Sequence, residues 1–535
     1  MGNEVNRRFF IGSSVAAASV LAFNRAWAQD IRLAKASRAV ETAAGRIQGV
    51  VLDGDVNAFY GVPYGASTSA ANRFMPPQLP APWNGVRATT TVGHRSPQDF
   101  GGPISEVHAL DRQETMSEDC LNLNVFTPAL GRGDRPVMVW LHGGGFTSGS
   151  GNWLLYDGAR LARSQDVVVV PVTHRLNVFG YLYLEELGGA NYAGAANVGM
   201  LDIVAALQWV RDNIGQFGGN PSNVTIFGQS GGGGKVAALL GMPAAKGLFH
   251  RAIGMSGSLI EGVPKDRATA AAERFMSAAG ARNVDELKSM PTERLRQAYV
   301  ATPGLQLNPT VDGRTLPEGP FAPGAPAVSA EVPLLVSSTE HEVNFFDGPL
   351  DEIAEADLLA HVKQATGAND TGARQAIDVY RAGRPGVSNV DLYQILASDN
   401  RFRHGVLTEA ERKAEQAAAP VYMYYFRWQS AVRGGKLKSY HCLDIPFAFD
   451  NVEVATSMTG TPNSRYALAT KVSSAFANFA RTGNPNVDGL PRWLEFDLAN
   501  RATMFIDNEW ELVNHPHRNE LAALAKLREA TSRSS

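Results

Sequence analysis

Cysteine is scarce in this chain of 535 residues, which contains only Cys120 and Cys442. Two cysteines do not make a disulfide framework, and nothing in the sequence places them together, so we expect two separate thiols. An excess of charge of one sign is also missing, because 49 lysines and arginines stand against 52 acidic residues, giving a net charge of -3. This balance gives no reason to expect nucleic acid or an anionic membrane as a partner.

Long apolar runs are missing from the sequence after its first 28 residues. Within that segment, Arg7-Arg8 precedes an apolar run too short to span a bilayer well, and an Ala-Trp-Ala cleavage site ends at Ala28. We predict that residues 1–28 are a twin-arginine export signal cut before Gln29, with an uncleaved N-terminal anchor as the alternative. The mature chain is then expected to be soluble, periplasmic or secreted, and without stable membrane insertion.

Neither internal repeats nor low-complexity linkers divide the chain, so we expect residues 29–535 to form one domain. Short apolar runs alternate with helical apolar spacings, such as that over 200–214. The predicted buried strands are 136–141, 166–172, 224–227, 250–255, 332–336 and 421–428. Such a pattern is typical of an α/β fold, in which helices cover both faces of a largely parallel sheet. Ligands bind beyond the carboxyl ends of such strands, and we expect helical and loop insertions over 343–400 and 450–500 to roof that edge.

The turn after the predicted strand 224–227 carries the motif Gly-x-Ser-x-Gly over 228–232, and a helix-compatible segment, 235–240, follows it. A serine at the tip of such a strand–turn–helix is held in a strained backbone conformation that exposes its hydroxyl. The following helix directs its free amides and its positive dipole end toward that serine. Ser230 is therefore a predicted hydrolase nucleophile. The alternative is a glycine-rich turn in which Ser230 only caps the helix.

A serine nucleophile needs a base, and the base needs an orienting acid. His441 lies in a Ser-Tyr-His-Cys-Leu-Asp segment after the predicted strand 421–428. The acid is expected between Ser230 and His441, after another strand, because α/β-hydrolases order these residues Ser, then Asp or Glu, then His. Glu340 and Glu342 both follow such a strand, and both remain candidates on this argument.

Acyl transfer also needs hydrogen-bond donors where the oxyanion develops, each contributing about 3 kcal/mol in the transition state. The segment His142-Gly143-Gly144-Gly145-Phe146 offers bare backbone amides in a loop after the predicted strand 136–141. Gly231, directly after the serine, offers another. A phosphate-cradling loop is the alternative for this glycine run, but the Lys-Ser/Thr ending of a P-loop is missing.

Further motifs occur in an order that resembles the type-B carboxylesterase and cholinesterase family of α/β-hydrolases, in particular its bacterial para-nitrobenzyl-esterase-like members. The resemblance covers nearly all of the chain after residue 28, and several motifs in the correct order are more specific than any one of them. The matching segments are FYGVPY at 59–64, RFMPP at 73–77, EDCLNLNV at 118–125, RLNVFGY at 175–181, FGGNP at 217–221, FHRAI at 249–253 and FARTGNP at 479–485.

The resemblance implies a role for each site residue. Ser230 falls at the nucleophile position, His441 at that of the base, and Glu342 at that of the acid, where the usual Asp-Glu-Gly reads His-Glu-Val. The oxyanion-hole positions are occupied by Gly144, Gly145 and Gly231. Glu340 is then a bystander with a solvated charge. Ser256 matches a family serine near the acid, where it either supports the site or has a plain structural role. No metal and no organic cofactor is implied.

Departures from the family pattern bear on the substrate. Cholinesterases carry a tryptophan where this chain has Leu110 and a glutamate where it has Gln229, and a quaternary ammonium needs an aromatic face or a carboxylate. Leu110 and Gln229 are therefore pocket candidates that argue against choline esters. Lys235 is expected to be solvated, although it could balance a buried helix start or line the rear of the site. Cys120 has lost its usual cysteine partner, and we expect Cys442 to serve packing where glycine is usual.

These residues predict a serine carboxylesterase that hydrolyses a small-molecule ester through an acyl-serine intermediate. A more specific alternative is an esterase for polycarboxylate esters, such as the tricarballylate side chains of fumonisins. A polyanionic acyl group needs cations near the catalytic residues, and the sequence offers His341, His174 and Arg175, of which Arg175 is rather expected to form a structural ion pair. The alternative that is not an enzyme is a binding or adhesion protein that keeps the fold and has lost the nucleophile.

Overall fold

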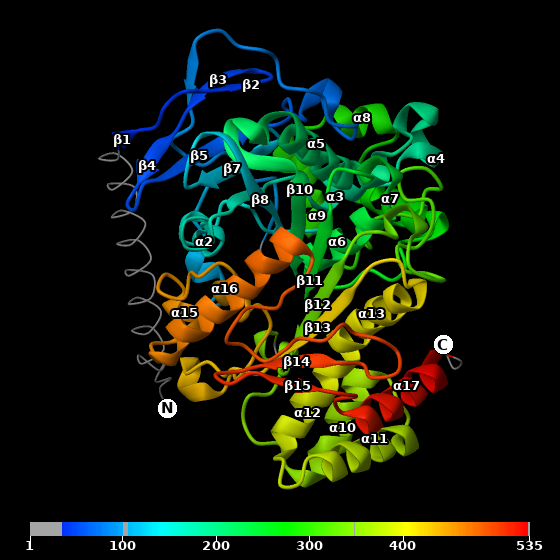
Figure 1. Ribbon diagram of the computed structural model, residues 1–535. Coiled ribbons are helices and arrows are strands. Elements are labelled where there is room, and N and C mark those ends of the chain that lie inside the picture. The colour runs from blue at the N-terminus through cyan, green and yellow to red at the C-terminus, as the bar shows by residue number, and fades with distance from the viewer. Residues whose placement is uncertain (1–34, 100–104, 347, 533–535) are drawn as a thin grey trace, which may run out of the picture.

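A large β-sheet runs through the molecule (Figure 1). The computed structural model describes residues 35–99, 105–346 and 348–532, so the predicted export signal, 1–28, lies outside the described residues. The strands of the large sheet are β1 (Lys35–Ala36), β4 (Val50–Leu52), β5 (Val56–Pro63), β7 (Asn122–Thr127), β8 (Gly131–Leu141), β9 (Val168–Val172), β10 (Phe217–Gln229), β11 (Arg251–Met255), β12 (Leu334–Thr339), β13 (Val421–Phe426), β14 (Thr503–Ile506) and β15 (Glu511–Val513). A smaller sheet contains β2 (Val40–Thr42), β3 (Gly45–Gln48) and β6 (Val86–Ala88).

The central part of the large sheet is parallel. Neighbouring strands follow the order β1-β4-β5-β7-β9-β8-β10-β11-β12-β13-β14-β15. All pairs from β9 to β14 are parallel, whereas the pairs among β1, β4, β5, β7 and β9 and the pair of β14 with β15 are antiparallel. Each strand predicted from the sequence overlaps one of these strands. The mostly parallel sheet is therefore confirmed, and its central strands bring their carboxyl ends to one edge.

Helices cover both faces of this sheet, as the side chains of β8 show. Val137 and Val139 belong to one buried cluster and Met138 and Trp140 to another, because successive side chains of a strand point to opposite faces. The first cluster includes side chains of α5 (Val198–Asn213), α6 (Gly231–Gly241), α7 (Lys265–Ala279) and α13 (His404–Gln416). The second includes those of α2 (Ala159–Gln165), α14 (Ile445–Ala448) and α16 (Ser464–Thr482). A strand buried on both faces accounts for the continuous apolar run in the sequence.

The two insertions expected over 343–400 and 450–500 lie in different parts of the molecule. The remaining α-helices are α3 (Asn177–Tyr181), α4 (Glu185–Gly188), α8 (Val284–Ser289), α9 (Thr292–Val300), α10 (Glu355–Thr366), α11 (Asp370–Gly383), α12 (Asn389–Ser398), α15 (Thr456–Thr459) and α17 (Arg518–Ser532). α10, α11, α12 and α17 share a separate apolar cluster and gather at the lower end of the molecule, near β14 and β15 (Figure 1). The expectation that 450–500 roofs the site is wrong for α16, because this helix packs against β8 and β10.

One segment of the described chain, Ala190–Gln216, is long and apolar enough to cross a membrane by length and composition alone. It contains α5, and 78% of its most apolar 18-residue stretch is buried inside the protein. Its side chains Ile203, Leu207 and Val210 belong to the first of the two buried clusters. The apolar side chains of this segment therefore pack into the core on one face of the sheet.

Candidate active site

Ser230 lies at a sharp turn between β10 and α6. Its backbone has φ 59° and ψ −125°, a conformation that is strained for a residue with a side chain. Its amide donates to the carbonyl of Met255 at 2.8 Å, and its carbonyl accepts from the amide of Gly234 at 3.1 Å. The Ser230 side chain makes no capping hydrogen bond with α6, so the capping interpretation finds no support. The strained strand–turn–helix expected for a nucleophile is present.

Two glycines allow the elbow to approach the strand and loop beside it. A methyl group at Gly232 would collide with the carbonyl oxygen of Leu141, and one at Gly231 would collide with the backbone of Gly145. The glycine loop after β8 therefore lies directly against the residue that follows the serine. Any larger side chain at Gly231 or Gly232 would separate these two segments.

Glu342 and His441 form a buried pair. Glu342 begins a short 3-10 helix after β12, and His441 lies in the loop after β13. Nδ1 of His441 lies 2.5 Å from Oε2 of Glu342, and neither side chain is more than 1% exposed. The amide of Thr339 donates to Oε1 of Glu342 at 2.7 Å. A carboxylate bound at Nδ1 fixes the proton there and leaves Nε2 free to accept one.

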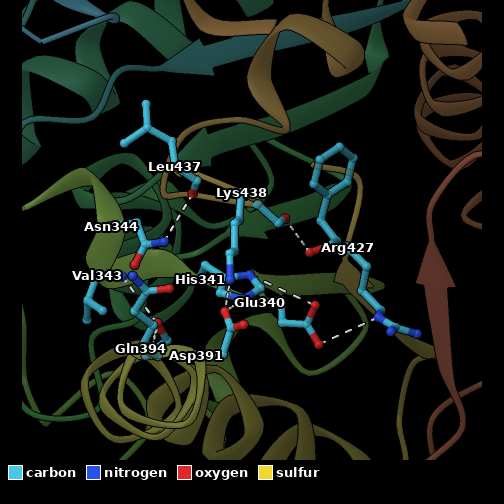
Figure 2. A network of polar contacts seen from close by, with 12 residues as sticks. Glu340, His341, Val343, Asn344, Asp391, Gln394, Arg427, Leu437 and Lys438 are labelled. Atoms are coloured by element: carbon cyan, nitrogen blue, oxygen red, sulfur yellow. Dashed lines mark hydrogen bonds and ion pairs between the residues drawn. The ribbon is translucent and has the colours of Figure 1, made fainter. Parts of the chain in front are cut away.

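Hydrogen bonds join the loop that carries Glu342 to the loop that carries His441. The amide of His341 donates to the carbonyl of Ser439 at 2.9 Å, and Nδ2 of Asn344 donates to the carbonyl of Leu437 at 3.2 Å (Figure 2). These contacts lie on either side of Glu342 in the sequence. They hold the two loops in register, which keeps the pair at hydrogen-bond distance without relying on the side chains alone.

The structure distinguishes Glu342 from Glu340. The Glu340 side chain turns toward Arg427, whose Nε lies 3.6 Å from Oε1, and within the described residues it forms no hydrogen bond or ion pair with His441 (Figure 2). The expectation that Glu340 carries a solvated charge is wrong, because this residue is only 6% exposed. The ion pair with Arg427 offsets its burial, and the His341 ring lies nearby, with 3.9 Å between Oε2 and Nδ1.

The cations proposed from the sequence do not face the pair. His341 is buried, its Nε2 lies 3.6 Å from Oδ1 of Asp391 (Figure 2), and burial lowers its pKa to about 4. Burial also lowers the pKa of His174, so neither ring carries a charge at neutral pH. Arg175 is fully engaged with Asp202, with Nη2 2.6 Å from Oδ1, as expected for a structural ion pair.

The glycine loop presents free backbone amides. Gly144 and Gly145 have φ 87° and 60°, and both are exposed although the flanking His142 and Phe146 are buried. In the described parts of the chain, the amides of Gly144, Gly145 and Gly231 donate no hydrogen bond. The first amides of a helix have no partner within the helix, which applies to Gly231 in α6. Three unpaired donors thus lie around the turn that carries Ser230.

Lys235 lies behind this loop, which corrects the expectation that it is solvated. It is fully buried, and its Nζ donates to the carbonyls of His142 at 2.9 Å and Gly145 at 2.7 Å. The ammonium also lies 5.2 Å from the centre of the Phe146 ring. Burial lowers the pKa of Lys235 to about 7.

Gln229 and Cys442 contact each other beside His441. The Sγ of Cys442 donates to Oε1 of Gln229 at 3.2 Å, and Nε2 of Gln229 lies 3.2 Å and 3.3 Å from the two ring nitrogens of His441. Nearly equal distances place this amide over the ring face, out of line with the lone pair of Nε2. Cys442 therefore does more than fill space. Cys442 and Cys120 are both free thiols, so the expectation of two separate thiols is confirmed.

Two further candidates are buried parts of the framework. Ser256 follows β11 with φ 46°, and its amide donates to the carbonyl of Ser337 at 2.8 Å, which links β11 to β12. Leu110 belongs to the second buried cluster, together with Trp153 and Tyr156. The structure thus gives both residues packing or backbone roles, and it shows no polar contact of either with the Glu342–His441 pair among the described residues.

Aromatic side chains around His441 were not found from the sequence. The ring centres of Phe345, Phe346 and Phe402 lie 5.8, 5.4 and 4.6 Å from that of His441. Phe345 and Phe346 follow Glu342 by only three and four residues, a spacing that was visible in the sequence. Phe402 comes from a π-helical turn, Asp399–Arg403, which gives no such signal. The three rings give the His441 imidazole an apolar setting.

Among the described residues, no cluster of three or more His, Cys, Asp or Glu side chains is arranged to hold a metal ion.

The Ser230 hydroxyl forms no hydrogen bond with any described residue. Such contacts are often long before substrate binds and tighten in the complex. The arrangement can therefore position a serine hydroxyl, a buried imidazole–carboxylate pair and three free amides around one reacting carbonyl group.

Comparisons with known proteins agree with this geometry. Residues 36–524 match the carboxylesterase family. The chain is 34% identical over 495 residues to the para-nitrobenzyl esterase of Bacillus subtilis (strain 168), an alignment that covers 89% of this chain and 96% of that protein. It is 34% identical over 505 residues to the liver carboxylesterase of Sus scrofa, covering 86% and 87% of the two chains. The crystal structure of a Geobacillus stearothermophilus carboxylesterase superposes with a TM-score of 0.79 at 36% identity, covering 91% of this chain and all of that one.

Proposed function

Because the chain belongs to the carboxylesterase family, we propose that Ser230, His441 and Glu342 are the nucleophile, base and acid of its ester hydrolysis. The protein is a serine carboxylesterase with the α/β-hydrolase fold. The observation that carries these residue assignments is the buried hydrogen bond between Nδ1 of His441 and Oε2 of Glu342, next to the strained turn at Ser230. An imidazole held in this way can take a proton from a serine hydroxyl.

The reaction follows from the positions of these groups. Oγ of Ser230 attacks the ester carbonyl carbon while Nε2 of His441 takes its proton, and the Glu342 carboxylate stabilises the resulting imidazolium. The amides of Gly144, Gly145 and Gly231 bind the oxyanion. The tetrahedral intermediate expels the alcohol, which receives the proton from His441. A water molecule then attacks the acyl-serine while Nε2 of His441 takes its proton. The second tetrahedral intermediate releases the acid, and His441 returns the proton to Oγ of Ser230.

A fluorophosphonate probe tests the nucleophile assignment. Because the probe phosphonylates an activated serine, we expect the intact mass to show a single adduct and peptide mapping to place it on Ser230. Prior incubation with a para-nitrophenyl ester should slow the labelling. If the protein neither hydrolyses para-nitrophenyl esters nor reacts with the probe, it is instead a non-catalytic binding protein with this fold.

Esters of polycarboxylic acids, including fumonisin tricarballylate esters, are a second candidate substrate class, and Arg401 favours it. The Arg401 guanidinium lies 4.1 Å from the centre of the Phe346 ring, which itself borders His441. Among the described residues, no carboxylate forms an ion pair with Arg401, and the residue is exposed. Its charge interacts with the Glu342 carboxylate without an ion pair, and its guanidinium can still bind a carboxylate on the acyl group.

Competing substrates test this candidate. We expect Arg401→Gln to lower kcat/KM for the para-nitrophenyl half-ester of glutaric acid by about 10-fold or more, since a hydrogen bond to a charged group contributes about 1.5–3 kcal/mol. The kcat/KM for neutral para-nitrophenyl butyrate should hardly change. Arg211→Gln, which removes a surface arginine paired with Asp212, is the matched control. A wild-type preference for the neutral ester that Arg401→Gln leaves unaltered would contradict the candidate.

Export of the protein remains a proposal that rests on the sequence of residues 1–28, which the structure does not describe. We propose cleavage before Gln29 and a soluble periplasmic or secreted product, with 29–535 as one domain. The match of the family over 36–524 supports a domain of this extent. The intact mass recorded in the labelling experiment, on protein from the periplasm or the culture fluid, should correspond to a chain that begins at Gln29. A mass that retains the first 28 residues would leave the anchor as the alternative.

A further inference from the structure

Lys235 is a buried cation that the reaction described above does not use. It lies in the second turn of α6, five residues after Ser230, and its side chain is 0% exposed. Its Nζ binds two backbone carbonyls, those of His142 and Gly145, at 2.9 and 2.7 Å. Both carbonyls belong to the loop that carries the three glycines. The ammonium therefore anchors this loop on both sides of Gly143 and Gly144.

No negative charge balances Lys235 among the residues that the structure describes, because none of their carboxylates forms an ion pair with it. The titratable groups that face it are imidazoles on the segments after β8 and β9. His142 stacks on His174 with ring centres 4.8 Å apart, and burial lowers the pKa of both, to about 3 for His142. Both rings are neutral, and the positive charge of Lys235 also lowers their pKa values.

Burying an ammonium group without a balancing negative charge costs free energy. The desolvation penalty is larger than the stabilisation from hydrogen bonds to two neutral carbonyls. A second buried lysine offers an internal comparison. Nζ of Lys413 also donates to two carbonyls, those of Ser329 and Ala330, at 2.9 and 2.7 Å. That contact lies before the start of β12, at the opposite edge of the sheet from the catalytic residues. Lys413 also donates to Oε1 of Gln416 at 2.8 Å, and the Glu331 carboxylate favours its charge, whereas Lys235 lies behind the loop of the free amides and has no such carboxylate among the described residues.

We propose that Lys235 is a positioning residue for the ester hydrolysis, which holds the loop of Gly143–Gly145 against the nucleophile turn and places a positive charge behind the oxyanion. This inference rests on the proposed roles of Ser230 and the loop amides. Gly145 gives its carbonyl to Lys235, while its own amide remains free for the oxyanion. Charge fixed before the reaction stabilises a developing anion without reorganisation in the transition state.

The test compares Lys235→Met with Lys413→Met in the mature protein. Loss of one direct oxyanion donor costs about 10²–10³-fold in kcat, so loss of its support in Lys235→Met is expected to lower kcat by about 10–100-fold and to change KM by less than about threefold. Lys413→Met should keep the wild-type kcat, even where its melting temperature falls. Fluorophosphonate labelling of Lys235→Met at Ser230, at a reduced rate, shows that the nucleophile turn is still folded.

The pH profile separates a role of the charge from a role in folding. Because burial lowers the pKa of Lys235 to about 7, the side chain loses its charge as the pH rises through this value. The wild-type kcat/KM should therefore fall above about pH 7, and this alkaline fall should be absent in Lys235→Met. Equal kcat and identical profiles of wild type and Lys235→Met would overturn the inference, as would equal losses in both variants. A wild-type protein without hydrolysis or labelling would instead overturn the proposed function itself.

Discussion

Replacing Ser230 with alanine is expected to lower kcat for para-nitrophenyl acetate by about 10⁶-fold, down to the rate that the oxyanion donors and binding alone support. The reason is that no other group at this turn can form the acyl intermediate. Folding should be preserved, because the hydroxyl makes no hydrogen bond with any described residue and alanine has the same backbone strain as serine at φ 59°. The measurement is steady-state hydrolysis, with the melting temperature recorded on the same samples.

A matched control removes a hydroxyl from the strand that precedes Ser230. Thr225 lies in β10, is fully buried, and its Oγ1 has no hydrogen-bond partner among the residues that the structure describes. Thr225→Val should therefore keep both the wild-type kcat and the fluorophosphonate adduct. Turnover by Ser230→Ala within tenfold of the wild-type rate would remove Ser230 as the nucleophile, whatever the stability of the variant.

Local sequence patterns were sufficient to predict the parts of the site that lie within one strand–turn–helix unit. The strand before Ser230 is recognisable from its β-branched and aromatic residues, and the strained turn from its glycines. The pairing of Ser230 with His441 and Glu342 needed the family resemblance, because the intervening sequence could not distinguish Glu340 from Glu342. In the structure the two carboxylates separate clearly, since Glu340 faces Arg427 and Glu342 faces His441.

The contacts that the sequence did not reveal join distant segments. Lys235 binds carbonyls 93 and 90 residues before it, and a lysine without such partners would be solvated. Gln229 and Cys442 are 213 residues apart, and each departs from the family pattern for no reason visible in its own neighbourhood. Together they form one contact, in which the thiol orients the amide that lies over the imidazole. The two departures from the family pattern, Gln229 and Cys442, therefore form one structural change beside His441.

Replacing Glu342 with glutamine is expected to lower kcat by about 10⁴-fold, the loss measured when the acid of such a triad becomes an amide. Oε1 of Glu342 accepts from the amide of Thr339 and Oε2 binds Nδ1 of His441, so both oxygens act as acceptors. Glutamine has one oxygen and one NH₂ group. If its oxygen faces Thr339, its NH₂ group faces Nδ1 and favours the tautomer with the proton on Nε2, which cannot take the proton of Ser230. In the opposite orientation, its NH₂ group meets the Thr339 amide, and two donors face each other.

Glu340→Gln is the matched control, because it makes the same chemical change in a buried carboxylate two residues away. It removes one partner of Arg427, so we expect a lower melting temperature and a kcat within about threefold of wild type. Both variants should be assayed with para-nitrophenyl acetate across pH 6–9, with fluorophosphonate labelling as a second readout. A large loss of kcat in Glu340→Gln, together with near-normal turnover in Glu342→Gln, would assign the acid to Glu340, because only the residue that holds Nδ1 of the base can set its tautomer.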